Sequence, residues 1–304
     1  MRMINTIFDQ YWKNSMYPFF ITVKRRMIIM ESIIEKMFSV RNKILFFSGG
    51  AGILASTLAH ELGKMGAQII LTDIAPLDDV LEKFKKESID VKGYHMDALN
   101  KQDIQNVALK VVQEFGKVDA LFNAAGGNMK DATVSPECSF FDLQLDALQK
   151  VVNLNLFGGA ILPSQVFAKL MIDNSDGGNI INFSSMTSFR PLTRIVGYSA
   201  AKAAVSNFTQ WLAVYIAQNY TPKVRVNALA PGFFVTKQNY YLLYQDDGTL
   251  SPRGEAILTH TPCGRFGEPQ DLLSTILWLL SPASSFVTGV VVPVDGGFSA
   301  FSGV

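Results

Sequence analysis

A tyrosine and a lysine lie four residues apart in the stretch YSAAK, Tyr198 to Lys202. The surrounding residues are typical of a helix, and four residues make about one turn, so both side chains would lie on one face. A phenol ordinarily loses its proton near pH 10, and a neighbouring cation favours the phenolate. The pair could therefore exchange protons nearer neutral pH, or it could be an ordinary surface pair, because Tyr-x-x-x-Lys is a common pattern.

A glycine-rich turn is the second candidate for chemistry. The stretch SGGAG, Ser48 to Gly52, follows the apolar run KILFF and precedes leucines at helical spacing. Glycines let the backbone approach a pyrophosphate, which rests on the N-terminus of the following helix. The pattern predicts a nucleotide site here, and a merely tight turn is the alternative.

An acidic residue follows the glycine-rich turn at a suitable distance. Asp73 ends the next apolar run, 73 − 49 = 24 residues after Gly49. A carboxylate at this place can accept hydrogen bonds from both hydroxyls of an adenosine ribose, and it would repel a 2′-phosphate. Asp73 therefore predicts NAD in preference to NADP, although the residue could also serve only as a helix cap or loop residue.

Other polar or small residues come at the ends of later apolar runs. Asp97 ends the third, where the adenine edge would lie, and the segment Asn123 to Gly126 ends the fourth and leaves room for a flat cofactor. Ser185 ends the fifth, 198 − 185 = 13 residues before Tyr198, and Pro231-Gly232 ends the sixth. In a parallel sheet these ends meet at one edge, so they predict one site, although each residue alone could be a cap or turn residue.

The elements that would position these residues alternate between strand and helix. We predict strands at residues 43–50, 67–73, 91–97, 118–127, 177–185, 224–232 and 289–297, and helices at residues 54–65, 77–88, 101–115, 142–172 and 197–220. This alternation predicts the α/β class, with a single doubly wound parallel-sheet Rossmann domain that carries helices on both faces.

Composition narrows the possible partners and compartments. The chain has 304 residues, a formal net charge of +1 and 48% hydrophobic residues, so nothing points to nucleic acid. No uninterrupted apolar run is long enough for a bilayer, and the two cysteines, Cys138 and Cys263, form no CxxC pair. The three histidines have no metal-ligand spacing. We expect a cytoplasmic protein with no metal and no membrane partner, in which residues 1–29 are a dispensable extension and residues 30–304 form the domain.

Taken together, these motifs resemble the short-chain dehydrogenase/reductase family over roughly residues 41–300. The order SGGAG, Asp73, Asp97, NAAG, Asn155, Ser185, YSAAK, PGFFVT and VDGG follows the pattern of that family. The stretches NAAGGN, AAKAAVSNFTQWLAV, HTPCGRFGEP and VVVPVDGGFSAFSGV are similar to its D-mannonate oxidoreductase (fructuronate reductase) subgroup. Ser48 stands where the family usually has threonine, Ile53 and Ala55 replace glycines, and Ala124 replaces an asparagine.

The resemblance implies a catalytic tetrad of Asn155, Ser185, Tyr198 and Lys202. Tyr198 would donate a proton to the substrate oxygen, and Ser185 would hydrogen-bond that oxygen. Lys202, with the positive nicotinamide in the oxidised complex, would lower the Tyr198 pKa, and it would also hold the nicotinamide ribose. Asn155 would position a water that relays protons to Lys202, although it could instead only kink its helix. The expected cofactor contacts, besides Tyr198 and Lys202, are Ser48, Gly49, Gly50, Gly52, Ile53, Asp73, Asp97, Asn123, Ala124, Gly126, Pro231, Gly232 and Thr236.

The same resemblance implies hexuronate metabolism, with reduction of D-fructuronate to D-mannonate. The carboxylate of D-fructuronate needs a positively charged or polar partner in the site. Arginine binds carboxylates bidentately, so we prefer Arg194 or Arg190 for this role. The other candidates, which follow the Pro231-Gly232 loop, are Lys237, Gln238 and Asn239. Residues 233–262 would form a lid over the substrate. Another sugar, a polyol or a 3-oxoacyl thioester remains an alternative substrate, and a catalytically silent NAD-binding regulator is the alternative of another class.

Members of this family are commonly tetramers, so the resemblance also implies a homo-oligomer, either a tetramer or a dimer. The apolar part of the last predicted long helix, residues 205–217, could pack against a partner copy through Phe208, Trp211, Leu212 and Tyr215.

Overall fold

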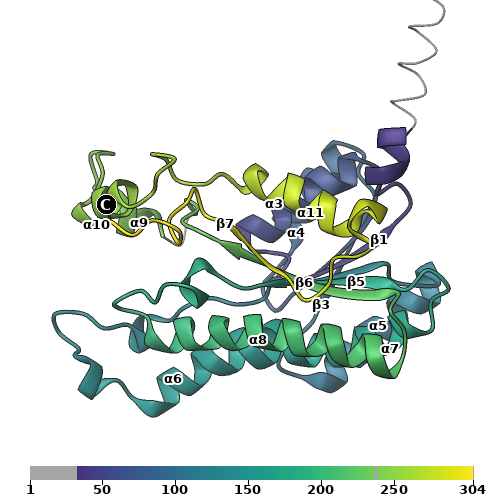
Figure 1. Ribbon diagram of the computed structural model, residues 1–304, viewed down its shortest axis with the longest axis horizontal. Coiled ribbons are helices and arrows are strands. Elements are labelled where there is room, and N and C mark those ends of the chain that lie inside the picture. Colours follow the sequence, from purple (N-terminus) through teal and green to yellow (C-terminus); the bar gives the residue numbers. More distant parts are fainter. Residues whose placement is uncertain (1–32, 237–238, 304) are drawn as a thin grey trace, which may run out of the picture.

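Seven parallel strands form one twisted sheet in the computed structural model, which describes residues 33–236 and 239–303 (Figure 1). Their spatial order is β3-β2-β1-β4-β5-β6-β7. The strands are β1 (Ile44–Ser48), β2 (Gln68–Asp73), β3 (Val91–His95), β4 (Ala120–Asn123), β5 (Gly178–Phe183), β6 (Val224–Pro231) and β7 (Val291–Val294). The predicted fold class is confirmed, since every strand is parallel to its neighbours and the order reverses beside β1.

Continuous apolar runs form these strands because both faces of the sheet are covered. In β1, Leu45 and Phe47 point into one core while Ile44 and Phe46 point into the other. In register, Phe46 pairs with Ile70 of β2 and with Leu121 of β4, so the central strands meet side by side. Fully buried parallel strands need apolar residues at every position, which is why period-two alternation is missing from the sequence.

Two layers of helices enclose the sheet (Figure 1). One core packs α3, α4 and α11 against the sheet, and the other packs α5, α7 and α8 on the opposite face. The α-helices are α3 (Ile53–Lys64), α4 (Asp78–Lys86), α5 (Lys101–Phe115), α6 (Leu145–Val152), α7 (Leu162–Ile172), α8 (Val196–Asn219), α9 (Tyr240–Leu243), α10 (Pro252–Thr259) and α11 (Leu273–Leu280). Short 3₁₀ turns lie at η2 (Lys130–Ala132), η3 (Phe140–Asp142), η5 (Met186–Ser188), η6 (Pro269–Leu272) and η7 (Pro282–Ser284).

The long helix predicted at residues 142–172 is interrupted. It begins at Leu145, and a π-helical segment, η4 (Asn153–Ile161), separates α6 from α7. The stretch Leu145–Ile172 is long and apolar enough to cross a membrane by length and composition. In this fold it lies against the sheet and α8, and Val151, Phe167 and Met171 are fully buried. Its apolar character is therefore that of a core helix.

Helix α8 presents aromatic side chains to the outside. Trp211 and Tyr215 are exposed and stack with ring centroids 4.9 Å apart. Leu212, expected on the same outward face, is buried in the core of this chain, because one residue along a helix turns the side chain by about 100°. The outward face that remains for a partner copy consists of Trp211, Val214 and Tyr215.

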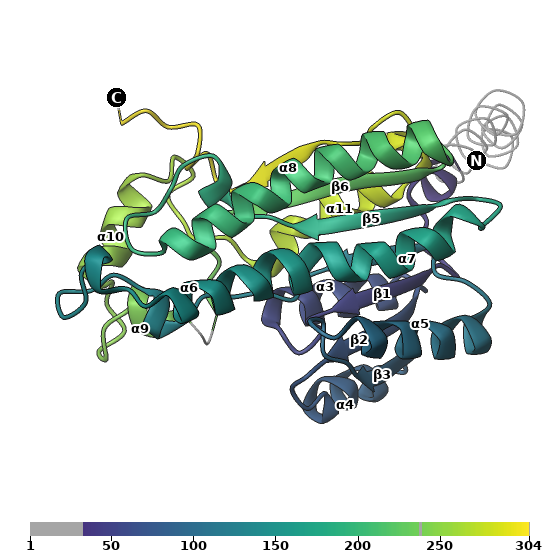
Figure 2. The same ribbon diagram turned by 90° about the horizontal axis from the view of Figure 1, so that it is seen from below.

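The segment after β6 forms a small substructure beside the carboxyl ends of the strands. Leu243 of α9, Ile257 of α10 and Phe266 make its apolar core. In both views α9 and α10 lie at the same end of the molecule as the amino end of α8 (Figures 1 and 2). The described part of residues 233–262 forms most of this substructure, and its role as a lid over the substrate stays a prediction. Residues 1–29, Lys237 and Gln238 lie outside the described residues.

Candidate active site

A cavity of about 740 Å³ lies at the carboxyl ends of the strands, where ligands bind in doubly wound sheets. Most of the predicted site residues line it, although they come from six different strand ends and from the helices α3 and α8. They are Gly49, Gly52, Ile53, Asp73, Asp97, Ala124, Gly126, Ser185, Tyr198, Lys202, Pro231, Gly232 and Thr236. Ala51, Ala125, Gly127, Leu154 and Phe234 also line the cavity, and no pattern in the sequence singled them out.

The glycine-rich turn owes its shape to a close approach between two strand ends. Gly49 has a φ of 72°, which favours glycine, and an added Cβ would lie 2.6 Å from the Ala125 nitrogen. Gly52 is the N-cap of α3, so the first turn of this helix opens onto the cavity. A side chain at Gly49 would push the glycine-rich turn away from the end of β4. These two segments together form one wall of the cavity.

Two carboxylates lie at the end of the cavity nearest β2 and β3. Asp73 accepts hydrogen bonds from the Ala51 nitrogen through Oδ2 and from the Ala75 nitrogen through Oδ1, both at 3.0 Å. Its carboxylate therefore holds the glycine-rich turn in place as well as lining the cavity. Asp97 accepts from the Leu99 nitrogen at 2.8 Å. Among the described lining residues, Lys202 is the only cation, so this end is acidic.

A phenol, a hydroxyl and an ammonium meet at the other end of the cavity. Tyr198 and Lys202 lie one turn apart in α8, and the Lys202 Nζ is 5.6 Å from the centre of the Tyr198 ring. Ser185 is the N-cap of η5, and its Oγ accepts from the Thr187 nitrogen at 3.2 Å. A hydrogen bond also joins Ser185 to the Tyr198 phenol. The fold thus brings Ser185 to the Tyr198–Lys202 pair, although Ser185 lies 13 residues before Tyr198 in the sequence.

Burial governs the protonation of this group. The pKa of the Tyr198 phenol is raised by burial, and the hydrogen bond with Ser185 partly opposes that rise. Burial also lowers the pKa of Lys202 to about 8, while its Nζ donates to the Phe183 carbonyl at 2.7 Å. The pKa of Tyr198 is thus raised in the protein without cofactor, and the expectation that Lys202 and an oxidised nicotinamide together lower it stays a prediction for the complex.

Asn155 lies behind the cavity wall and does not line it. It sits in η4, where its Nδ2 donates to the Val151 carbonyl at 2.8 Å and to the Gly127 carbonyl at 2.6 Å. Its Oδ1 accepts from the Gly127 nitrogen at 3.0 Å. An added Cβ on Gly126 would lie 2.7 Å from this oxygen and 3.3 Å from the Lys202 Nζ. Asn155 and Lys202 therefore flank the same glycine, and Asn155 fixes the backbone there.

Three predicted cofactor contacts point away from the cavity. Ser48 is fully buried, and its hydroxyl donates to the Phe122 carbonyl at 3.4 Å. Gly50 packs against Leu71 of β2. The Asn123 side chain lies in the core, where its Nδ2 donates to Asn182 at 2.8 Å and to Ser164 at 2.9 Å. Successive residues of a strand face opposite sides of the sheet, so only some residues at a strand end can face the ligand.

Of the substrate candidates among the described residues, only Asn239 lines this cavity. Arg194 and Arg190 are exposed and do not line it. Thr236 lines it, and its backbone nitrogen donates to the Asn239 Oδ1 at 2.7 Å. Asn239 also donates to the Phe234 carbonyl at 2.8 Å, so its side chain braces this loop. Sequence analysis missed Arg253 of α10, which lies close enough to Arg194 for their charges to interact.

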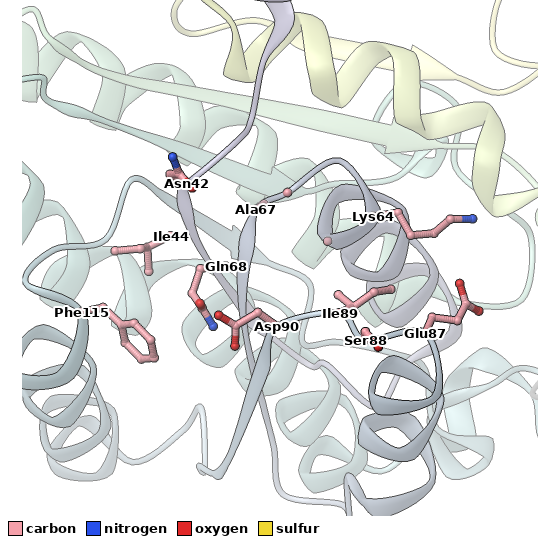
Figure 3. A pocket seen from close by; sticks show the side chains of 12 residues that line it. Asn42, Ile44, Lys64, Ala67, Gln68, Glu87, Ser88, Ile89, Asp90 and Phe115 are labelled. Carbon is pink, nitrogen blue, oxygen red and sulfur yellow. The ribbon is translucent and has the colours of Figure 1, made fainter.

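A second cavity, of about 660 Å³, lies at the amino ends of the strands. Figure 3 shows Ile44 and Phe115 on one side of it and Lys64 and Glu87 on the other. None of the predicted site residues lines this cavity. Because ligands of doubly wound sheets bind at the carboxyl ends, we place the candidate active site in the other cavity.

The candidate active site suits a dinucleotide in shape and charge. Its volume of about 740 Å³ falls within the usual range for cofactor pockets. The amino end of α3 opens onto it and can receive a pyrophosphate, while Asp73 can receive ribose hydroxyls. Beyond Gly126, Lys202 and Tyr198 would face the ribose and ring of a nicotinamide. The residues present therefore fit NAD.

Comparisons with known proteins agree with this arrangement. The sequence pattern of a family described as enoyl-(acyl carrier protein) reductase matches residues 50–299. A solved structure from Haemophilus influenzae, described as a candidate D-mannonate oxidoreductase with bound NAD, is 44% identical, with a TM-score of 0.81. The match covers 88% of this chain and 98% of that one.

Two further relatives carry names that refer to sugar acids. The 2-dehydro-3-deoxy-D-gluconate 5-dehydrogenase of Dickeya dadantii is 32% identical over 269 residues, which cover 88% of this chain and all of that protein. A solved structure from Beutenbergia cavernae, described as a candidate NAD(P)-dependent gluconate 5-dehydrogenase with NADP at low occupancy, is 28% identical, with a TM-score of 0.75. That match covers 87% of this chain and 99% of the other.

Proposed function

The chain belongs to the short-chain dehydrogenase/reductase family, and on that premise we propose that it reduces the C5 ketone of D-fructuronate to give D-mannonate, with NADH as the reductant. Its membership makes it an oxidoreductase that acts on CH–OH groups with a nicotinamide cofactor. The observation that carries the proposal is the meeting of Tyr198, Ser185 and Lys202 at one end of a dinucleotide-sized cavity that has Asp73 at the other end.

The side chains at this end have complementary roles in a carbonyl reduction. When bound, the reduced nicotinamide supplies a hydride to the carbonyl carbon. Tyr198 donates its phenolic proton to the carbonyl oxygen, so that a C–H and an O–H bond form as the C=O π bond breaks. The Ser185 hydroxyl donates a hydrogen bond to the same oxygen and stabilises the charge that develops on it.

Lys202 supports Tyr198 in two ways in this proposal. Its Nζ faces the Tyr198 ring at 5.6 Å from the ring centre, so its charge favours the phenolate that remains after proton transfer. With a pKa lowered to about 8, Lys202 can also pass a proton at a pH near neutrality. Asn155 holds the Gly126–Gly127 backbone between these groups, and we expect its proton relay to run through a water in this region.

The substrate assignment is supported by chemistry shared with the relatives. Both relatives with sugar-acid names are described as acting at carbon 5 of a six-carbon acid, which is where D-fructuronate carries its ketone. The structure described as a candidate D-mannonate oxidoreductase has the highest identity of the three, at 44%. The exposed Arg194, four residues before Tyr198, is available for a carboxylate.

The same cavity favours NAD in this proposal. A 2′-phosphate would lie against Asp73 and, among the described lining residues, would find no arginine or lysine at that end of the cavity. We therefore expect NADH to be preferred to NADPH. We also expect a cytoplasmic homo-oligomer, which the free cysteines Cys138 and Cys263 and the exposed aromatic face of α8 support.

A substrate panel tests the proposed function. NADH oxidation is followed with D-fructuronate, 5-keto-D-gluconate, a neutral ketose and an acetoacetyl thioester, and NMR identifies the stereochemistry of the product. We expect the highest kcat/KM with D-fructuronate and D-mannonate as the product. Good turnover of another panel member with none of D-fructuronate would reject the substrate. No turnover of any member, together with NAD binding, would favour a silent NAD-binding regulator.

A further inference from the structure

Three serines beside the candidate active site share one hydrogen-bond network. Ser184 directly precedes Ser185 in the chain. The Ser184 Oγ lies 2.8 Å from the Ser188 Oγ and 2.7 Å from the Ser206 Oγ. The same hydroxyl donates to the Lys202 carbonyl at 3.0 Å. The network therefore joins the segment that follows β5 to the part of α8 that carries Lys202.

The number of protons on these hydroxyls gives the network a direction. A serine hydroxyl has one proton to donate and can accept two hydrogen bonds. Ser188 donates its proton to the Ser185 carbonyl, so Ser184 is the donor in the contact between Ser184 and Ser188. Ser184 thus directs its proton either to Ser188 or to the Lys202 carbonyl. In both cases Ser206 donates to Ser184, and the chain of hydroxyls ends on the backbone of Ser185.

The residues on either side of Ser184 hold the catalytic groups. The Phe183 carbonyl accepts from the Lys202 Nζ at 2.7 Å. On the other side, the Ser185 side chain is hydrogen-bonded to the Tyr198 phenol. A shift of Ser184 relative to α8 would therefore disturb both contacts at once.

The Ser184 hydroxyl faces α8 and η5, although the residue borders the cavity. Ser184 is only 3% exposed, and its nitrogen donates to the Leu229 carbonyl of β6 at 2.7 Å, so its backbone is fixed to the sheet. Ser188 and Ser206 are half-buried, so water can satisfy their hydroxyls when Ser184 is replaced. The main effect of the network is therefore on the relative position of β5 and α8.

That relative position matters for a carbonyl reduction. The substrate oxygen must meet the Ser185 and Tyr198 hydroxyls together while the carbonyl carbon faces the nicotinamide. These two hydroxyls come from different elements, one from the end of β5 and the other from α8. A misplacement of about 1 Å between reacting groups can cost about 100-fold in rate.

We propose that Ser184 is a positioning residue, which through Ser188 and Ser206 fixes the end of β5 against the catalytic turn of α8. In this role Ser184 keeps the Ser185 hydroxyl within reach of the Tyr198 phenol and contacts neither substrate nor cofactor. The inference rests on the proposed proton transfer from Tyr198. It does not depend on which carbonyl compound is reduced.

Serine-to-alanine variants of the full chain test this role. S184A, S206A and the control S284A are assayed with the member of the substrate panel that the parent reduces fastest. Ser284 is fully buried in η7, which comes before β7 at the opposite end of the sheet from the cavity, and its hydroxyl donates to the Leu279 and Ser281 carbonyls. S284A therefore reports what the loss of a buried hydroxyl does elsewhere in the fold.

We expect kcat to fall about 10- to 100-fold in S184A, with KM for NADH within about threefold of the parent. S206A removes one half-buried donor and should lower kcat about 2- to 10-fold; it carries the test by itself if S184A does not fold. S284A should keep the kcat and KM of the parent. S184T, which keeps the hydroxyl, should recover most of the kcat that S184A loses.

Two measurements separate positioning from a general loss of stability. NADH that carries deuterium at the transferred position should show a larger isotope effect on kcat in S184A than in the parent, because misplaced groups slow the hydride step itself. The double variant S184A/S206A should lose no more activity than S184A, because the Ser206 hydroxyl acts through Ser184. Losses that multiply in the double variant would overturn the network, and so would a fall in kcat that S284A shares.

The outcomes also separate the positioning role from the proposed function. If the parent reduces D-fructuronate and S184A keeps its kcat, the function stands and the role of Ser184 fails. If the parent reduces only another member of the panel and S184A loses kcat as expected, the substrate is wrong and the role stands. Near-native turnover by Y198F, or no turnover of any member by the parent, would remove both.

Discussion

Replacing Lys202 by methionine should separate stability from activity. The ammonium is buried, and burial lowers its pKa from 10.5 to about 8, so the folded protein binds this proton less tightly than the unfolded chain does. A pKa lowered from 10.5 to about 8 means that the buried charge costs about 3 kcal/mol at neutral pH, since tenfold weaker proton binding corresponds to about 1.4 kcal/mol. The hydrogen bond from Nζ to the Phe183 carbonyl returns about 1 kcal/mol of this.

The sign of the pH dependence follows from the direction of the shift. Below pH 8 both folded and unfolded chains hold the proton, so the penalty is constant. Above pH 8 the folded protein releases the proton while the unfolded chain keeps it up to about pH 10.5, so the stability of the parent rises with pH. Relative to K202M, the free energy of unfolding of the parent should rise by about 2 kcal/mol between pH 7 and pH 9.5.

Equilibrium urea unfolding of both proteins at several pH values measures this difference. The contributions of titratable groups that both proteins share cancel in the difference between their free energies of unfolding. The phenol of Tyr198, whose pKa is raised, stays protonated from pH 7 to pH 9.5. K202M should be about 2 kcal/mol more stable than the parent at pH 7, should lose that advantage by pH 9.5, and should lose at least about 100-fold in kcat/KM. A difference in stability that stays constant from pH 7 to pH 9.5 would refute the argument that burial sets the Lys202 pKa.

Three further predictions concern the donor, the cofactor and the amino-terminal residues. Y198F should keep its fold and NAD affinity, since the ring packs with Val151, but lose about 100-fold or more in kcat; near-native turnover would remove Tyr198 as proton donor. The parent should show a higher kcat/KM with NADH than with NADPH, and D73S should narrow or reverse that preference; equal use of both cofactors by the parent would show that Asp73 does not face the ribose. A chain that starts at Met30 should express and turn over like the full chain, and a loss of either would assign residues 1–29 a structural role.

Local patterns were sufficient to predict the sheet and much of the site. The first strand, predicted at residues 43–50, forms at Ile44–Ser48, and the helix predicted at 101–115 forms at Lys101–Phe115. Tyr198 and Lys202 could be paired from sequence because one helical turn fixes their relation. Asp73 and Gly49 could be associated because a strand, turn and helix in that order bring a second strand end beside the turn.

Those patterns could not predict which way each side chain at a strand end points. Asn123 and Ala124 are neighbours at one strand end, yet Ala124 lines the cavity while Asn123 hydrogen-bonds Asn182 in the core. The π-helical segment places the Asn155 side chain against the backbone of Gly127, 28 residues earlier in the chain, where Oδ1 accepts from the Gly127 nitrogen. The raised pKa of Tyr198 likewise depends on how deeply the phenol is enclosed, which spacing along the chain does not reveal.

The sequence by itself determined the parallel α/β sheet, the glycine-rich turn and the Tyr198–Lys202 pair, because hydrophobic periodicity and short-range spacing fix these features. Only the tertiary structure decided which residues meet across the cavity. Ser185 reaches Tyr198 because the end of β5 and the amino end of α8 lie side by side, and Asn155 reaches the Gly127 backbone because η4 packs beside the end of β4. Contacts between residues of different helices and strands depend on how these elements pack together. That packing is determined by all the side chains of the core, not by short-range spacing in the sequence.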